Sequence, residues 1–178
     1  MDRLRLAGSA VAATLLLTAG VLAFAGGDHG SEPPLAIGSE PRLVSTAELA
    51  ELEGALGHPV YWVGERSGNA LELSREADGS IYLRYLAHGS EAADPRQSHL
   101  TVGTYPVADA VGALERTARE GDSTVRRLQS GAVLLANQDS GSAYLAYPGE
   151  DLQIEVYDPA PGKALKLIEA GAVGPVSR

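Results

Sequence analysis

The chain has 178 residues and a net charge of −9 at pH 7, and 44% of its residues are hydrophobic. A surface this acidic repels phosphate groups, which argues against the binding of nucleic acid. The chain contains no cysteine, which excludes disulfides, thiol catalysis, cysteine-ligated zinc and lipid attachment through a cysteine.

An uncharged, mostly apolar run extends from residue 6 to residue 27, directly after Arg3 and Arg5. A helix that crosses a bilayer needs about 20 apolar residues, and the two arginines would keep its N-terminus in the cytoplasm. The Ala-Phe-Ala sequence that ends at Ala25 also fits a signal peptide cleaved after Ala25. We therefore expect residues 1–27 to be a transmembrane anchor or a signal peptide. Both alternatives place the rest of the chain outside the cytoplasm, either at the cell membrane or secreted.

A flexible stalk is predicted at residues 28–42, which are rich in Gly, Pro, Ser and acidic residues and have no apolar periodicity. Residues 43–178 are then enough for a single extracytoplasmic domain. The first 27 residues carry two arginines against one aspartate, so the −9 of the whole chain leaves −10 for residues 28–178. We interpret this charge as a solubilising surface.

The domain begins with a predicted helix. Ser45 and Glu48 have the spacing of a capping box. Leu49 and Leu52 then share one helical face, and Gly57 is a typical helix end.

Two sets of four strands follow, and each set leads into a helix. The first set is predicted at 59–64, 70–76, 80–87 and 99–105 with a helix at 107–120, and the second at 123–129, 131–137, 142–148 and 152–158 with a helix at 162–170. Turn sequences such as Asp78-Gly79 separate the strands.

The third strand of each set contains the same motif, Tyr82-Leu83-x-Tyr85 and Tyr144-Leu145-x-Tyr147. We therefore predict an α+β fold built from a duplicated unit of four antiparallel strands plus a helix, in the order αββββα-ββββα, after one N-terminal transmembrane or signal helix. The repeats would span 43–121 and 122–173. The two helices would occupy equivalent places, covering Leu83 and Leu145. The first repeat carries an additional loop at 87–99, expected to be exposed and poorly ordered.

Strand alternation places Tyr82 and Tyr144 on the face opposite these leucines. Two interpretations of the aromatic residues stay open. The aromatic residues supply bulk on a solvent-exposed sheet surface, or they form an aromatic face that binds an unknown envelope protein or a small apolar ligand. The candidate residues of such a face are Tyr61, Trp62, Tyr82, Arg84 and Tyr144.

No catalytic motif, glycine-rich phosphate loop or calcium loop occurs, so we assign no catalytic residues and no cofactor. The 87–99 loop holds the best metal-ligand candidates, but their spacing fits no known metal motif. They are His88, Glu91, Asp94 and His99.

The segments PVYW, YLRYL, VGTYP and EVYDP resemble those of an uncharacterised family of exported, N-terminally anchored bacterial proteins, over residues 43–176. The resemblance implies export and no particular activity. Two functions remain open: a membrane-tethered, non-enzymatic binding module, or an envelope hydrolase that acts through the 87–99 loop.

Overall fold

The structure of the chain, a computed structural model, describes residues 40–96 and 98–177. The predicted transmembrane or signal helix at 1–27 and most of the predicted stalk lie outside these residues. Within the two described ranges, no helix is long and apolar enough to span a membrane.

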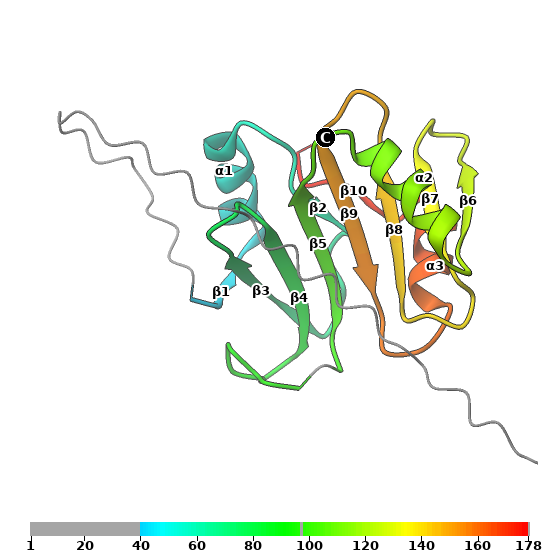
Figure 1. Cartoon of the computed structure of the whole chain (residues 1–178). Coiled ribbons are helices and arrows are strands. Elements are labelled where there is room, and N and C mark those ends of the chain that lie inside the picture. The colour runs from blue at the N-terminus through cyan, green and yellow to red at the C-terminus, as the bar shows by residue number, and fades with distance from the viewer. Residues whose placement is uncertain (1–39, 97, 178) are drawn as a thin grey trace, which may run out of the picture. The chain divides into compact units, whose positions relative to one another are not determined.

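An eight-stranded antiparallel sheet forms the centre of the domain (Figure 1). Its strands, in spatial order, are β1 (Arg42–Val44), β3 (Asn69–Arg75), β4 (Ile81–Ala87), β5 (Leu100–Pro106), β9 (Leu152–Tyr157), β8 (Ser142–Ala146), β7 (Val133–Ala136) and β6 (Thr124–Arg127). The two halves of the sheet meet at β5 and β9. The domain is α+β, as predicted.

The two faces of the sheet are covered differently. On the first face, α1 (Thr46–Leu56) and α3 (Lys163–Glu169) pack against the sheet together with a two-stranded ribbon of β2 (Tyr61–Trp62) and β10 (Gly174–Pro175). On the second face, α2 (Ala110–Glu120) packs on β6, β7 and β8, and it lies in front of them in Figure 1. Over the rest of the second face, at β4, β5 and most of β9, none of the described helices lies above the sheet.

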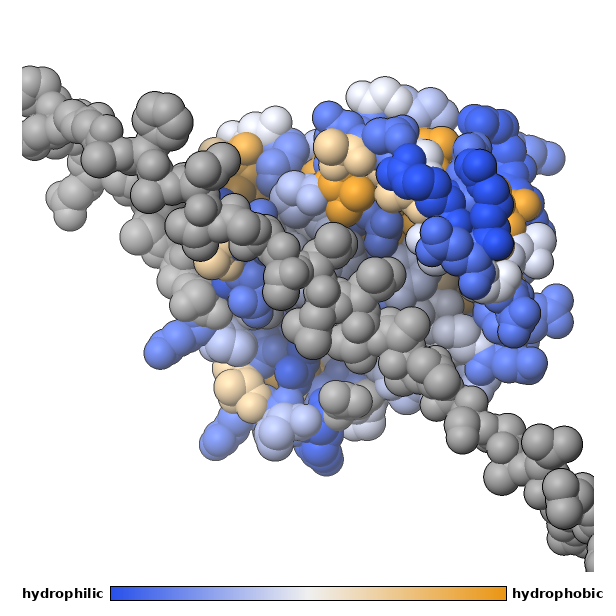
Figure 2. Space-filling model, in the orientation of Figure 1, coloured by the Kyte–Doolittle hydropathy of each residue, from blue (hydrophilic) through white to orange (hydrophobic). Residues whose placement is uncertain are grey.

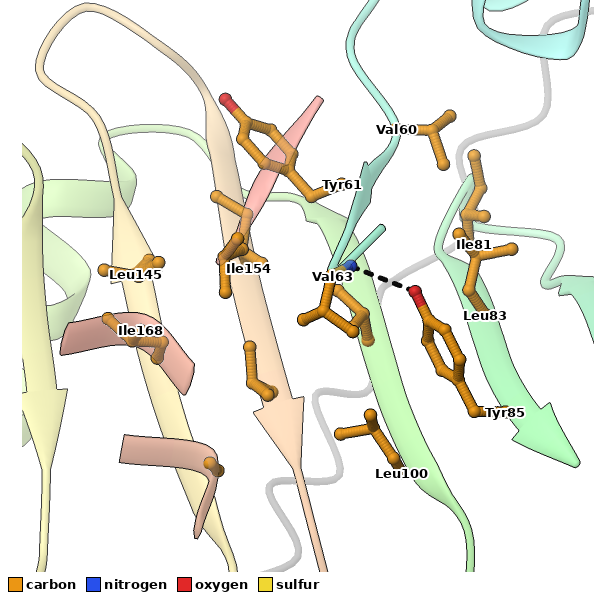
Figure 3. Packing of buried hydrophobic residues seen from close by; sticks show 14 of the residues in the cluster. Val60, Tyr61, Val63, Ile81, Leu83, Tyr85, Leu100, Leu145, Ile154 and Ile168 are labelled. Carbon is orange, nitrogen blue, oxygen red and sulfur yellow. Dashed lines mark hydrogen bonds between the residues drawn. The ribbon is translucent and has the colours of Figure 1, made fainter. Parts of the chain in front are cut away.

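The main core lies on the first face. Leu83 is 0% exposed and Leu145 is 2% exposed, so the predicted burial of both is confirmed. Figure 3 shows how strand residues such as Ile154 pack against Ile168 of α3 in this core, and how the backbone N–H of Val63 donates to the Tyr85 hydroxyl at 3.0 Å.

The first helix begins and ends as its sequence predicts. The Ser45 side chain accepts from the Glu48 backbone N–H, and the Glu48 carboxylate accepts from the Ser45 backbone N–H. Gly57 ends the helix in the left-handed conformation, at φ 69°, which glycine adopts without steric cost.

The predicted strand at 59–64 does not join the main sheet, which corrects that part of the prediction. Its short β2 pairs with β10 instead, and the Tyr61 backbone N–H donates to the Thr104 hydroxyl at 3.2 Å. Residues 42–44, at the boundary between predicted stalk and domain, form the edge strand beside β3.

The helices that follow the two sets of strands lie on opposite faces, so the prediction of equivalent places is wrong. The reason lies in β7, where Val133, Leu134 and Leu135 are all buried, so apolar side chains point to both faces. Both faces of the second half therefore need a cover, and α2 and α3 provide one each. In the first half, the second face carries Tyr82 and Arg84, whose polar groups can remain exposed to solvent, so this face does not need a helix to cover it.

Candidate ligand-binding cleft

A cleft of about 460 Å³ lies on the second face, over β4, β5 and β9, and no residue of a described helix lines it. Hydrophilic side chains cover α2 on this side of the domain (Figure 2). The cleft is lined by Tyr82, Arg84, Pro95, Arg96, His99, Thr101, Gly103, Tyr105, Glu155 and Tyr157.

The strand register brings the floor of the cleft together. Tyr82 of β4 pairs with Gly103 of β5, Gly103 pairs with Glu155 of β9, and Glu155 pairs with Tyr144 of β8. Directly opposite residues of antiparallel strands have their side chains on the same face, about 5 Å apart. Four strands from both halves of the chain therefore contribute to one row.

Gly103 makes room for an aromatic ring at the centre of this row. A Cβ atom on Gly103 would lie 2.5 Å from the hydroxyl oxygen of Tyr105 and 2.6 Å from its ring carbon Cζ. Tyr105 thus folds back across Gly103, and its hydroxyl donates to Glu155 Oε2 at 2.6 Å. Its ring meets Tyr82 edge-on, with ring centroids 5.6 Å apart. The two rings form a fixed aromatic wall.

Glu155 accepts hydrogen bonds at both carboxylate oxygens, since the Ser142 hydroxyl donates to Oε1 at 2.7 Å. Burial, and then the charge of Glu155, raise the pKa of Tyr105 above its usual range. The same two causes raise the pKa of Tyr144 to about 12. Both hydroxyls therefore stay protonated at neutral pH.

The opposite end of the cleft rests on a buried ion pair. Arg84 Nε lies 3.0 Å from Oε1 of Glu72, whose side chain is 1% exposed. Both partners also hold the 87–99 loop, because Arg84 donates to the Asp94 carbonyl oxygen at 2.6 Å and Glu72 accepts from the Ala93 backbone N–H. The pair fixes the loop against the sheet.

The prediction of an exposed loop is wrong at Asp94 and His99. His99 is 8% exposed, and its Nε2 lies 3.5 Å from Oδ2 of Asp94. Hydrogen bonds donated by Arg96 hold the pKa of the Asp94 carboxyl well below its usual range. His99 Nε2 is buried without a hydrogen bond to any described residue.

The structure divides the five residues of the predicted aromatic face. Tyr82 and Arg84 line the cleft, and Tyr144 lies next to Glu155, packed against the apolar side of α2. Tyr61 and Trp62 are on the other face of the sheet, where Tyr61 stacks on Tyr147 at 5.7 Å and donates to Glu150 at 2.9 Å.

Sequence reasoning missed Tyr105, Glu155 and Tyr157 as cleft residues. A signal for two of them was present, because strict alternation in β9 places Glu155 and Tyr157 on one face. Tyr105 lies in β5, and the position of β5 beside β9 depends on pairing between residues far apart in the sequence.

Of the four weak metal-ligand candidates, the structure brings together only Asp94 and His99, while His88 and Glu91 are exposed. No group of three or more His, Asp or Glu side chains is placed to hold a metal ion among the described residues.

A second hollow, of about 640 Å³, lies at the sheet edge near the start of α1. Its aromatic residue is Tyr85, whose hydroxyl is already engaged by Val63 and Gly64. Thr46 donates to Glu65 in its wall at 2.6 Å. The tyrosine-lined cleft is therefore the better candidate site.

No known protein family, curated protein or solved structure matches this chain, so the site is interpreted through its own geometry.

Proposed function

We propose that the protein is a non-enzymatic binding module that is held outside the cytoplasm and binds a small ligand in the tyrosine-lined cleft. The observation that carries this proposal is the aromatic wall of Tyr82 and Tyr105, which no described helix covers, on a sheet face that α2 covers elsewhere. The cleft volume of about 460 Å³ falls within the usual range for small-molecule sites, about 300–1,000 Å³.

The acidic groups in and beside the cleft, Glu155 and Asp94, support binding rather than catalysis. Glu155 accepts from two hydroxyls, and Asp94 accepts from Arg96. A general acid or base needs to be free to reach a proton on the substrate, and these carboxylates are already engaged. The Asp94–His99 contact at 3.5 Å is what favours the alternative, an envelope hydrolase that acts through the 87–99 loop.

The extracytoplasmic location rests on the apolar run at residues 6–27 and the preceding Arg3 and Arg5. A membrane-anchored protein and a secreted one would both carry the cleft outside the cytoplasm. The absence of cysteine is compatible with either location.

We further infer that the strands of the two halves arose by duplication. Aligning the two Tyr-Leu-x-Tyr motifs and the later tyrosines, Tyr105 with Tyr157, makes Gly103 correspond to Glu155. Tyr82 pairs with Gly103 and Tyr144 pairs with Glu155, so corresponding residues pair in both halves. An experimental structure tests this inference: β3–β5 should superpose on β7–β9 in this register, and a shifted register would contradict it.

Native mass spectrometry tests the binding function. The full-length protein would be purified from the membranes of the cells that produce it and compared with the cleft variant Tyr82→Ala and the control variant Tyr147→Ala, whose ring lies on the opposite face. We expect a small-molecule adduct on the wild type and the control that is lost from Tyr82→Ala. Absence of any adduct, or an adduct that survives in Tyr82→Ala, would contradict a ligand in the cleft.

Turnover of the bound material distinguishes the hydrolase from the binding module. If the adduct is a fragment that the wild type releases from envelope material and His99→Gln does not, the protein is a hydrolase and not a binding module.

A further inference from the structure

We propose that the ligand of the cleft is a neutral carbohydrate, a mono- or disaccharide unit such as those in envelope polysaccharides. This inference rests on the proposed function, because it names the chemical class that the same cleft would bind. Three properties of the cleft carry it: charged groups that already have polar partners, a fixed aromatic wall and a buried imidazole nitrogen that has no hydrogen bond to a described residue.

Each charged group in or beside the cleft already has a polar partner within the protein. Arg84 is bound by Glu72, Arg96 by Asp94, and Glu155 accepts from two hydroxyl groups. An anionic ligand would meet these three carboxylates or would have to separate existing ion pairs. A cationic ligand would meet the two arginines. A neutral ligand avoids both costs.

The aromatic wall suits the apolar face of a pyranose ring. Tyr105 is held in place by its bond to Glu155 and by the edge contact with Tyr82, so binding costs little additional ordering. Gly103, lying under the Tyr105 ring, leaves the floor without a side chain of its own. Tyrosine offers an apolar body and a polar hydroxyl, which matches a molecule with C–H groups on its faces and hydroxyls at its edge.

The rim favours a hydroxylated ligand over an apolar one. His99 lines the cleft, is 8% exposed, and its Nε2 has no hydrogen bond within the described ranges. A buried polar atom without a hydrogen bond is unfavourable, because it has lost its bonds to water. A sugar hydroxyl donates and accepts, so it satisfies Nε2 in either tautomer of the imidazole. An apolar ligand would leave this atom with only its 3.5 Å contact to Asp94 Oδ2.

Saturation-transfer NMR tests this inference. Full-length protein in an amine-oxide detergent, which contains no sugar, is mixed in turn with neutral trisaccharides of glucose, N-acetylglucosamine and mannose. The charged control is trigalacturonic acid, and the apolar control is a long-chain alcohol. We expect a signal with at least one neutral sugar and none with either control.

Substituted variants show whether the saturation-transfer signal comes from a sugar bound in the cleft. Tyr82→Ala should weaken the affinity at least tenfold, Tyr82→Phe should keep most of it because the ring remains, and Tyr147→Ala should leave it unchanged. Melting temperatures show whether each variant folds, and Tyr82→Leu, which removes the ring but keeps apolar bulk, replaces Tyr82→Ala if that variant does not fold. His99→Phe, which removes the rim nitrogen but keeps a ring, should also weaken binding.

The outcomes separate the two proposals. Tyr82-dependent binding of the acid or the alcohol, without a neutral sugar, overturns the carbohydrate inference and leaves the binding function standing. Sugar binding that Tyr82→Ala does not change also overturns the inference. If no probe binds, the carbohydrate inference fails, and the binding function is decided by whether native mass spectrometry finds an adduct.

Discussion

Tyr105 lies across Gly103, two residues earlier in the same strand, and donates a hydrogen bond to Glu155 of the neighbouring strand at 2.6 Å. The glycine is therefore a packing requirement of the cleft rather than a weak point of β5. A side chain at position 103 would occupy the space of the tyrosine ring.

We expect Gly103→Ala to lower the free energy of unfolding by about 1–3 kcal/mol, the usual cost of overpacking. The added methyl group would lie 2.5 Å from the Tyr105 hydroxyl oxygen, so the ring must turn away and lose its bond to Glu155. Chemical denaturation measures the change. The control is Gly54→Ala in α1, where no described atom outside the adjacent helix backbone lies within 4 Å of the added Cβ and helix propensity favours alanine by about 1 kcal/mol. Equal effects of the two substitutions would contradict this account of Gly103.

Glu72→Ala should be among the most destabilising substitutions outside the apolar core. Removing one partner of a buried ion pair costs about 3–5 kcal/mol. We expect the lower part of that range, because the Arg84 side chain is 23% exposed and regains some hydration. The comparison is Glu115→Ala, which breaks an exposed pair with Arg119 at 4.0 Å and should cost no more than about 0.5 kcal/mol. A cost for Glu72→Ala below 1 kcal/mol would show that this pair does not fix the loop.

Shortening the 87–99 loop should lower the melting temperature. An exposed, poorly ordered loop, as the sequence predicted, could be shortened at little cost, but Asp94 and Ala93 supply hydrogen-bond partners to Arg84 and Glu72. A shorter loop leaves those buried groups without partners. Thermal unfolding of a variant with the four residues Pro-Gly-Glu-Asp in place of the loop checks this. An unchanged melting temperature would restore the original prediction.

Leu83→Ala and Leu145→Ala should each cost about 2–5 kcal/mol, since each leaves a cavity in the main core. The two leucines hold corresponding places in β4 and β8 and are both buried. Urea denaturation of both variants gives the comparison. A cost below 1 kcal/mol for either would contradict its place in the core.

Alkaline pH should destabilise the domain through its tyrosines. Burial is the main cause that raises the pKa of both Tyr85 and Tyr144 to about 12, against about 10 in the unfolded chain. Below pH 10 both states are protonated and the stabilisation is complete. Between pH 10 and 12 the unfolded state loses protons first, so stability falls by about 1.4 kcal/mol per pH unit for each tyrosine. Denaturation at pH 9 and pH 11 measures the loss, and Tyr144→Phe should reduce it. Ionisation of Tyr85 or Tyr144 near pH 10 without loss of native structure would contradict the prediction.

Local signals in the sequence predicted much of the fold. The capping box at Ser45, the turn at Asp78-Gly79 and the burial of Leu83 depend on neighbouring residues, and all three occur in the structure. Strand neighbours depend on contacts far apart in the sequence. The pairing of Gly103 with Glu155 and the separation of Tyr61 from the cleft could therefore not be predicted.

The position of α2 shows the same limit. The sequence predicted a helix at 107–120, but the face of the sheet that it covers is set by Val133 and Leu135, whose side chains point away from the main core. Only the assembled sheet shows which surface is left open over β4, β5 and β9.

Amide chemical-shift mapping tests the central claim, that the cleft is the binding site, most directly. Isotope-labelled full-length protein is titrated with a small-molecule extract of the envelope of the cells that produce it. We predict shifts that are confined to the cleft, at residues such as Tyr82, Thr101, Gly103 and Tyr157, and that disappear in Tyr82→Ala. Shifts centred on Tyr61 and Trp62 on the opposite face, or no shifts at all, would contradict it.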